Sequence, residues 1–442
     1  MSLKVSYSGV RGIVGESLTA EVAERYGRAF GALVSERNPH PTLLLARDTR
    51  PSGPQLLEAL IRGLPEGRLL DLGVVATPTI QCCMQPLQAD GALMVTASHN
   101  PSQWNGFKFF LGPENTVLDG AQTERLQALV QSGTGQGRPG QLLEMHERAL
   151  ELHLERVLAQ VDCERIRRRA LRVAVDAGGG AGEELLVRLL ERLGCFTAVV
   201  RSGRESEPTA ESLKDLCQAV LAHGCQLGLA QDLDGDRLAL VTEQGRAPGE
   251  ESTLVLVVEH VLSNRPGPVV VVKNLTTTRA VNDVAARHGA RVVETRVGEV
   301  NLSRALAMHS AEGFAFGGEG NGGVIFPPVS LGRDSLVGTA LVLECLASDA
   351  RTLSQRLAEL PFYHHVGNKL PLGPSLPELY ARLEAAFPEA TPDRLDGLRL
   401  SFADGSWLGV RPSNTEPIVR VVAESRVAGW PEATLGRVRE LA

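Results

Sequence analysis

The chain has little of several residue types, and each shortage argues against a class of protein. Aromatic residues make up only 4% of its 442 residues, which disfavours a surface that stacks nucleic-acid bases. Basic residues are outnumbered, because 45 Lys and Arg stand against 52 Asp and Glu, a formal charge of −7. This acidic balance argues against nucleic acid or an anionic membrane surface as a partner.

Long apolar runs and cysteines are also scarce. No apolar run approaches the roughly 18 residues that cross a bilayer, and the opening MSLKVSYSGVRG lacks the apolar core of a secretory signal. The seven cysteines are odd in number, thinly spread and without CxxC spacing, so neither a disulfide framework nor a zinc site is expected. We therefore expect a globular protein of the reducing cytoplasm, without membrane or nucleic-acid partners.

What the chain does have is a regular alternation of strand-like apolar runs and helical patterns. Such pairs occur at 42–46 with 55–63, at 171–176 with 183–193, and at 269–272 with 279–288. Two further strand-like runs, 228–231 and 238–242, flank an acidic turn. This rhythm predicts α/β domains with parallel or mixed sheets.

Turn-rich segments divide the chain into domains. The clearest linker is the Gly- and Pro-rich segment 132–140, and a charged stretch that follows it, 142–169, is predicted to be helical. Further boundaries fit the turns near 247–250 and 359–362. The predicted domains therefore span residues 1–145, 146–248, 249–360 and 361–442.

The first chemically notable segment follows a strand-like run, residues 91–97. The run ends at Ser98 and His99, and the proline that comes next prevents the strand from continuing. A hydroxyl where a strand leaves the core is a candidate nucleophile, and an ordinary loop is the alternative. His99 is poorly placed as its base, because adjacent side chains of an extended chain point in opposite directions. Lys108 follows an Asn-Gly turn pair that is expected to fold the lysine back over Ser98.

Three carboxylates alternate along the segment DLDGDR, residues 232–237. Alternate side chains of an extended segment share a face, so all three can converge on one point. Three like charges need a cation, and hard oxygen ligands suit Mg²⁺. The spacing also fits part of an EF-hand, but Arg237 stands where that loop requires glycine. The segment therefore predicts a magnesium site, with a solvated acidic turn as the alternative.

Two later loops have the composition of ligand sites. RPSNTEP, residues 411–417, supplies a guanidinium, hydroxyls, an amide and backbone N–H groups that can surround a phosphate, with Arg420 close behind. GGEGNGG, residues 317–323, places the carboxylate of Glu319 and the amide of Asn321 where they can bind sugar hydroxyls. A surface turn and a plain hairpin loop are the respective alternatives.

Together these loops resemble the signature loops of the α-D-phosphohexomutase superfamily. Residues 96–108 (TASHNPSQWNGFK) resemble its phosphoserine loop, 232–237 its metal loop, 318–323 its sugar-recognition loop and 411–417 its phosphate-binding loop. Their order and spacing also agree, and the similarity covers essentially the whole chain. The resemblance implies three similar α/β domains with mixed sheets, and a smaller C-terminal α+β domain like the TATA-binding protein, around a central cleft.

The resemblance implies a phosphoryl-transfer enzyme that interconverts a hexose 1-phosphate and a hexose 6-phosphate. Ser98 would carry the phosphoryl group, and hexose 1,6-bisphosphate would be the intermediate and activator. Lys108 is assigned to proton transfer or to stabilising the transferring charge. The implied catalytic residues are Arg11, Ser98, His99 and Lys108. The implied Mg²⁺ ligands are Ser98, Asp232, Asp234 and Asp236. The implied substrate-binding residues are Arg237, Glu319, Asn321, Arg411, Ser413, Asn414, Thr415 and Arg420.

Two positions depart from the family pattern. The N-terminal motif appears as VSYSGVRG and keeps only Gly9, Arg11 and Gly12 of its firm positions, and Gly323 stands where bacterial members often have a histidine. We expect a phosphoglucomutase/phosphomannomutase, monomeric or homodimeric. The alternatives are a phosphoglucosamine mutase, a catalytically silent sugar-phosphate binding protein, and a phosphatase that uses an aspartyl nucleophile.

Overall fold

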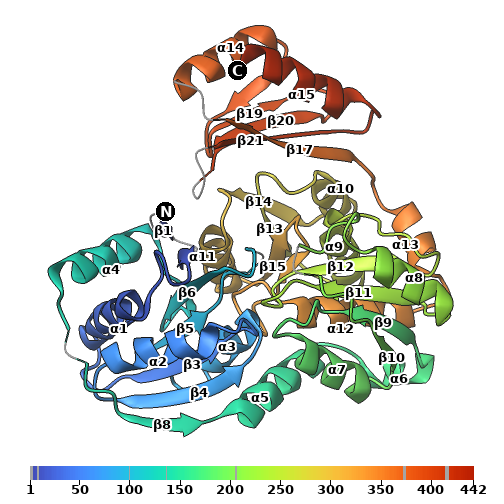
Figure 1. Cartoon of the computed structure of the whole chain (residues 1–442). Helices are drawn as coiled ribbons and strands as arrows, with labels where there is room; N and C mark the ends of the chain where they lie inside the picture. The colour runs from blue at the N-terminus through green and yellow to red at the C-terminus, as the bar shows by residue number, and fades with distance from the viewer. Residues whose placement is uncertain are drawn as a thin grey trace.

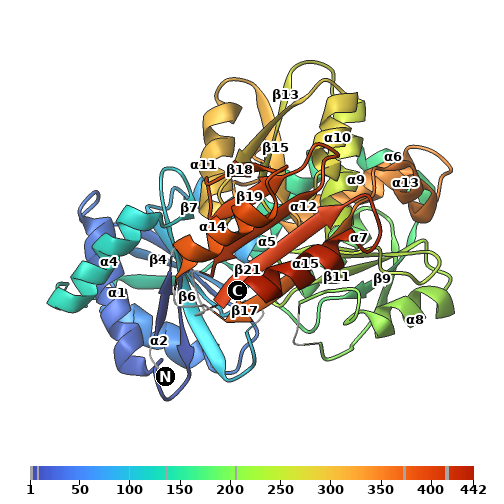
Figure 2. The ribbon, with the colours of Figure 1, turned by 90° about the horizontal axis from the view of Figure 1, so that it is seen from above.

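Three α/β domains form one body, and a fourth domain stands above it (Figure 1). Seen from above, the fourth domain lies across the middle of the body (Figure 2). The computed structural model describes residues 3–6, 9–98, 100–135, 137–204, 207–371, 375–413 and 418–442. We number the domains I to IV in chain order, each by its own sheet.

Domain I is built on an eight-stranded mixed sheet in which β7 pairs with β6 and the others follow the order β1-β2-β6-β5-β3-β4-β8. Its strands are β1 (Lys4–Ser6), β2 (Gly9–Ile13), β3 (Thr42–Arg47), β4 (Arg68–Val74), β5 (Gly91–Val95), β6 (Trp104–Leu111), β7 (Thr116–Val117) and β8 (Gln141–Glu144). Its helices are α1 (Ala20–Ser35), α2 (Gly53–Gly63), α3 (Thr77–Met84) and α4 (Gly120–Ser132). Strand β5 is buried along its whole length, which explains its unbroken apolar sequence.

Domains II and III each have a four-stranded sheet, in the orders β10-β9-β11-β12 and β14-β13-β15-β16. Domain II contains α5 (His146–Leu158), α6 (Cys163–Arg169), β9 (Arg172–Asp176), α7 (Glu183–Arg192), β10 (Phe196–Val199), α8 (Lys214–Ala222), β11 (Leu227–Gln231) and β12 (Leu238–Thr242). Domain III contains α9 (Glu251–Asn264), β13 (Val269–Asn274), α10 (Ala280–Arg287), β14 (Arg291–Thr295), α11 (Glu299–Ser310), β15 (Phe314–Glu319), β16 (Gly323–Ile325), α12 (Ser335–Ala347) and α13 (Leu353–Glu359).

The first three domains share one strand plan. Each has three parallel strands, β4-β3-β5, β10-β9-β11 or β14-β13-β15, and an antiparallel fourth strand beside the third. The fourth strand is β6, β12 or β16, and it is joined to the third by a hairpin. The predicted repetition of one α/β topology is therefore confirmed, although no repeat is visible in the amino-acid sequence.

Domain IV is a two-layer α+β unit with an antiparallel sheet in the order β17-β21-β20-β19-β18. Its strands are β17 (His364–Pro371), β18 (Thr391–Asp393), β19 (Leu398–Ser401), β20 (Trp407–Pro412) and β21 (Ile418–Ser425). Its helices, α14 (Leu376–Ala386) and α15 (Trp430–Leu441), cover the sheet face that points away from the body (Figure 1).

One predicted element was wrong. The stretch 142–169 was expected to be helical throughout, but its start is β8, which pairs in parallel with β4 at the edge of the domain I sheet. The remainder is two helices, α5 and α6, and Asp162 caps the second by accepting the backbone N–H of Arg165. Pairing with β4 at the sheet edge overrides the local helical pattern. Sequence composition does not reveal this pairing.

Buried residues join the first three domains. One apolar core runs from strand residues of domain I, such as Leu44, through domains II and III to Tyr363, and domain I has a second core that includes Phe30. A buried polar chain crosses the same three domains: Thr79 Oγ1 lies 3.0 Å from His153 Nδ1, and His153 Nε2 lies 2.9 Å from Asp334 Oδ2. Domain IV has its own core, which includes Leu383 and Leu408. Among the described residues, no helix combines the length and the apolar character needed to cross a bilayer.

Candidate active site

A cavity of about 950 Å³ lies where the four domains meet, and predicted site residues from every domain line it. Arg11, Ser98 and Lys108 come from domain I, and Arg237 comes from domain II. The remaining predicted lining residues are Glu319, Asn321, Arg411, Ser413 and Arg420. The predicted site residues His99, Asn414 and Thr415 lie outside the described residues.

The four loops occupy equivalent hairpins. Ser98 lies between β5 and β6, residues 232–237 lie between β11 and β12, and residues 320–322 lie between β15 and β16. These are the third-to-fourth strand connections of domains I, II and III. Ser413 begins the corresponding connection of two antiparallel strands in domain IV, β20 to β21. The shared topology of domains I to III therefore brings three distant sequence segments to one cavity, and a hairpin of domain IV brings a fourth.

The Ser98 loop is held by residues that the sequence analysis did not select. Ser98 has φ of 51°, a left-handed conformation that is unusual for a residue with a side chain. Its backbone N–H donates to Thr96 Oγ1 at 2.9 Å. Buried Arg50 donates to the carbonyl oxygens of Ser98 at 2.7 Å, Asn100 at 2.5 Å, and Pro101 and Trp104 at 2.9 Å each. Arg50 therefore fixes the curvature of the whole loop.

Lys108 reaches the site by a different route from the one expected. The Asn105-Gly106 pair is not a turn but part of β6, opposite β2 and β5. The chain reverses earlier, at hydrogen bonds from Asn100 N–H to the Ala97 carbonyl and from Trp104 N–H to the Pro101 carbonyl. An Asn-Gly pair favours a turn only where it is not paired within a sheet, and here β6 pairs with its neighbouring strands.

The three aspartates of residues 232–237 converge as predicted, but by a turn and not by the alternation of an extended segment: Gly235 N–H donates to the Asp232 carbonyl oxygen at 3.1 Å, and Gly235 has φ of 69°. Each offers an oxygen, and these oxygens lie within 4.8 Å of one another in a fully buried cluster. Within the described part of the chain, one oxygen of each carboxylate has no hydrogen-bond partner: Asp232 Oδ2, Asp234 Oδ1 and Asp236 Oδ1. Buried carboxylate oxygens normally accept hydrogen bonds, so a buried cluster of three carboxylates with an oxygen of each left without one suits a hard divalent cation.

The other oxygen of each aspartate is held by protein donors. Asp232 Oδ1 accepts two backbone N–H groups of its own loop, at 3.0 and 3.1 Å. Asp234 Oδ2 accepts from Lys108 Nζ at 2.6 Å and from Thr77 Oγ1 at 2.9 Å, both in domain I. Asp236 Oδ2 accepts from Arg333 Nη2 at 2.6 Å, in domain III. Such outer contacts orient carboxylates toward a metal.

Charges in this cluster shift the pKa values in opposite directions. Burial, together with the charges of Asp236 and Asp234, raises the pKa of Asp232 well above its ordinary value. Burial opposes ionisation of Asp234 too, but the charge and hydrogen bond of Lys108, together with hydrogen bonds from Asp232 and Ser98, hold the pKa of Asp234 well below the usual range. Burial opposes the charged form of Lys108, yet Asp234 and Asp236 raise its pKa. Lys108 is therefore a fixed cation at neutral pH.

Two more arginines surround the cluster. Arg237 Nε lies 3.9 Å from Asp232 Oδ2 and 3.8 Å from Asp236 Oδ1, while its Nη1 pairs with Glu207 at 2.5 Å. Arg11 donates to Asn100 Oδ1 at 2.8 Å and lines the same cavity. The region around Ser98 thus carries the cations that a phosphoryl group requires.

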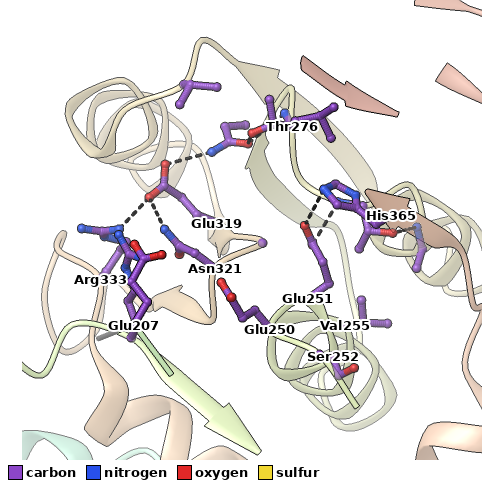
Figure 3. Close-up of a pocket in the computed structure, with 18 of the residues that line it drawn as sticks. Glu207, Glu250, Glu251, Ser252, Val255, Thr276, Glu319, Asn321, Arg333 and His365 are labelled. Carbon is purple, nitrogen blue, oxygen red and sulfur yellow. Dashed lines mark hydrogen bonds and ion pairs between the residues drawn. The ribbon is translucent and has the colours of Figure 1, made fainter. Parts of the chain in front are cut away.

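The sugar-loop residues point into the cavity beside Arg333 (Figure 3). Glu319 Oε1 accepts from Asn274 Nδ2 at 2.8 Å, and its Oε2 accepts from Arg333 Nη1 at 2.9 Å and Asn321 Nδ2 at 3.4 Å. Neither Asn274 nor Arg333 was selected from the sequence. Only Arg333 had a local signal, a charged residue immediately before the helix cap Asp334.

Domain IV places two arginines at opposed positions of neighbouring strands. Arg411 on β20 and Arg420 on β21 are directly opposed in the strand register, and both line the cavity. Like charges directly opposite each other on a sheet are unfavourable unless an anion lies between or near them. Arg411 Nε is balanced by Asp396 at 3.2 Å. The pair is suited to a phosphate at the end of the cavity contributed by domain IV.

Comparison with known proteins agrees with this geometry. Four family profiles match in order: phosphoglucomutase/phosphomannomutase domain I at residues 3–136, domain II at 151–245, domain III at 249–363 and the C-terminal domain at 376–438. Phosphoglucomutase/phosphomannomutase of Thermococcus kodakarensis is 36% identical over 432 residues, which cover 95% of this chain and 93% of that protein.

Two further relatives complete the picture. A probable phosphoglucosamine mutase of Methanopyrus kandleri is 35% identical, and the match covers 95% of this chain and 93% of that protein. The crystal structure of a phosphoglucomutase/phosphomannomutase family protein of Burkholderia thailandensis has a TM-score of 0.83 at 29% identity, and covers 99% of this chain and 96% of that one.

Fold and site together define an enzyme class, the intramolecular phosphotransferases that work on hexose phosphates. The chain belongs to the phosphoglucomutase/phosphomannomutase family of the α-D-phosphohexomutase superfamily. The expected four-domain architecture is thereby confirmed.

Proposed function

We propose that this phosphohexomutase is a phosphoglucomutase/phosphomannomutase that works through phosphorylated Ser98. The observation that carries the proposal is that Ser98 and Lys108 of domain I and Arg411 and Arg420 of domain IV line the same cavity. A sugar with two phosphate positions needs a reacting end and a holding end in one space. The buried aspartate cluster contacts Lys108 at the reacting end.

The residues of the chain divide the work by position. Arg411, Ser413 and Arg420 hold the phosphate that does not react, and Glu319 and Asn321 bind sugar hydroxyls between the two ends. The bond between Ser98 Oγ and phosphorus breaks as the free sugar hydroxyl forms its own bond to phosphorus. The hydroxyl proton leaves the sugar and ends on Ser98. After the bisphosphate turns round, the reverse transfer of its other phosphoryl group restores phosphorylated Ser98.

Charge at the reacting end is the second requirement. Lys108 is charged and buried beside Asp234, so its ammonium group can neutralise the phosphoryl oxygens without reorganising. We propose that Ser98, Asp232, Asp234 and Asp236 hold Mg²⁺, which when bound would act as a Lewis acid toward the phosphoryl group. Arg11 and Arg237 face the same region and complete the cationic surround.

Replacement of the serine tests the proposal. Ser98→Ala should lower mutase activity by at least about 10³-fold, because the phosphoryl carrier is gone. Intact mass of the wild-type protein should show a species about 80 Da heavier, removed by phosphatase and mapped to Ser98. Ser102→Ala, an exposed serine of the same loop, is the matched control and should retain activity. Full activity of Ser98→Ala would overturn the mechanism, and an aspartyl-phosphate in its place would point to a phosphatase.

Phosphoglucosamine mutase is the second candidate, because relatives of nearly equal identity carry that description. The same machinery serves both reactions, and the sugars differ at carbon 2. Comparison of kcat/KM for the 1-phosphates of glucose, mannose and glucosamine separates the candidates. The highest kcat/KM with glucosamine phosphate would replace the leading proposal.

A further inference from the structure

Arg333 joins the metal loop to the sugar loop. Its side chain is largely buried and makes three ion pairs: Nη2 with Asp236 at 2.6 Å, Nη1 with Glu319 at 2.9 Å, and Nε with Glu299 at 3.2 Å. Asp236 belongs to domain II and the two glutamates to domain III. One guanidinium therefore spans two domains and touches both the proposed cation site and the proposed sugar site.

The space for this side chain exists because residue 323 is glycine. A Cβ atom at Gly323 would lie 2.4 Å from Arg333 Cδ and 2.9 Å from its Cγ. Gly323 is in β16 and is not among the described glycines with positive φ, so the backbone does not require glycine there. What requires glycine is mainly the room taken by the arginine, since the next nearest atom, Asn321 Oδ1, would lie 3.0 Å from the Cβ. Any side chain at position 323 would push Arg333 away from Asp236 and Glu319.

We propose that Arg333 is a positioning residue that sets the relative placement of the Asp236 and Glu319 carboxylates, an inference that rests on the proposed function. By holding Asp236 Oδ2, it leaves Oδ1, which accepts no hydrogen bond from the described residues, available to the proposed cation. By holding Glu319 Oε2, it limits the orientations of the carboxylate that meets the sugar. Occupation of one site is thus linked to the geometry of the other.

The chemistry of guanidinium suits this task. Its planar fork donates to two carboxylates at once and remains charged at every pH at which the protein is folded. A lysine at the same place would keep the charge but has a single nitrogen, so it could not hold Asp236 and Glu319 in the same arrangement. Arg333→Lys therefore separates positioning from charge.

Two variants test the inference from opposite sides. Arg333→Lys removes the fork, and Gly323→Ala displaces the native arginine without altering it. Both should lower Mg²⁺ affinity by about tenfold or more, the effect expected when the outer contact of a metal ligand is lost. Affinity is measured by calorimetric titration of the dephosphorylated full-length protein with MgCl₂. Both variants should also raise KM for glucose 1-phosphate more than they lower kcat.

Two matched controls test whether the effects are specific to the bridge, that is, to the contacts of Arg333 with Asp236 and Glu319. Gly313→Ala adds a methyl group in open space in domain III, and Arg287→Lys changes an exposed arginine of α10. Both should bind Mg²⁺ as the wild type does. Combining Arg333→Lys with Gly323→Ala should cost less than the product of the single effects, because both break one contact. Independent, multiplicative effects would contradict the inference.

The outcomes separate this inference from the proposed function. If both folded variants bind Mg²⁺ and glucose 1-phosphate within twofold of the wild type, Arg333 is not a positioning residue, whatever the enzyme does. If only the melting temperature falls, Arg333 has a structural role and the inference is wrong. If the wild type itself lacks mutase turnover, the proposed function fails, and loss of Mg²⁺ affinity in both variants would still establish the bridge.

Discussion

The reacting end and the holding end of the cavity are built differently. Domains I, II and III share one apolar core and the buried chain Thr79–His153–Asp334. Domain IV has a separate core and meets domain III through polar groups: Glu424 accepts the Arg279 N–H at 2.8 Å, and Arg399 pairs with Glu294 at 2.9 Å. Polar interfaces between domains with separate cores permit relative motion.

The difference teaches how the work is divided. The groups proposed to handle the transferring phosphoryl lie within the body, where packing holds them at fixed distances. The arginines proposed to hold the second phosphate belong to domain IV, which has a separate core. If a bisphosphate turns round in the cavity, one of its ends must be released, and the polar interface of domain IV would permit that release.

The largest expected effect comes from removing the charge that links domains I and II. Lys108→Met leaves the Asp234 carboxylate buried without its cation, so the free energy of unfolding should fall by about 3–5 kcal/mol. The rate constant kcat should fall by at least about 10²-fold. Urea unfolding and steady-state kinetics measure both. Lys214→Met, an exposed lysine of α8, is the control. Retention of wild-type kcat would show that the reacting end does not depend on this charge.

Mg²⁺ should stabilise the body and not domain IV. At a free concentration 100 times its dissociation constant, a ligand of the folded state contributes about 2.7 kcal/mol. Because the pKa of Asp232 is raised without metal, protons compete with Mg²⁺ at low pH, and the stabilisation should grow as pH rises from 5 to 8. Calorimetric scans with Mg²⁺ or EDTA measure this. An equal rise in the unfolding temperatures of the body and of domain IV would contradict the proposed difference between these two regions.

A change at the holding end should affect KM and not kcat, which distinguishes it from the reacting end. Arg411→Ala should raise KM for the sugar phosphate by about 10- to 100-fold, the worth of a charged hydrogen bond to phosphate. Phosphorylation of Ser98 and the stability of the body should change little, since Arg411 lies in domain IV. Arg439→Ala, exposed on α15, is the control. A fall in kcat with KM unchanged would place Arg411 at the reacting end instead.

The smallest effect concerns the docking of domain IV. His365 Nδ1 lies 3.0 Å from Glu424, and its Nε2 lies 3.8 Å from Glu251 of domain III. Burial opposes its protonation, but these carboxylates raise the pKa of His365. Its contribution is therefore fully present below the unfolded pKa, about 6.5, and is lost as pH rises through the higher folded value. Between pH 6 and 8.5, the unfolding temperature of domain IV should fall further in the wild type than in His365→Gln. Equal falls in the two proteins would show that this contact does not contribute to stability.

Local patterns in the sequence predicted those elements and site residues that depend on neighbouring residues in the chain. The spacing of the aspartates in 232–237 indicated a cation site, although a turn and not an extended segment brings the carboxylates together. The αβ rhythm predicted α/β domains with parallel or mixed sheets, and the family resemblance predicted that three of them are alike. Contacts between distant segments had no such signal. Arg50 holds a loop 48 residues away, and Arg333 meets Asp236 across 97 residues. Strand β8 was missed for the same reason, because its partner β4 is what makes it a strand.

The buried chain Thr79–His153–Asp334, with Arg333 beside it, also sets an order of events during synthesis. The Ser98 loop and the aspartates are translated early, but the residues that join them to domain III emerge last among the first three domains. Domains fold as they leave the ribosome. A nascent chain that ends before residue 333 therefore carries the serine and the aspartates without the Asp236–Arg333 and His153–Asp334 contacts.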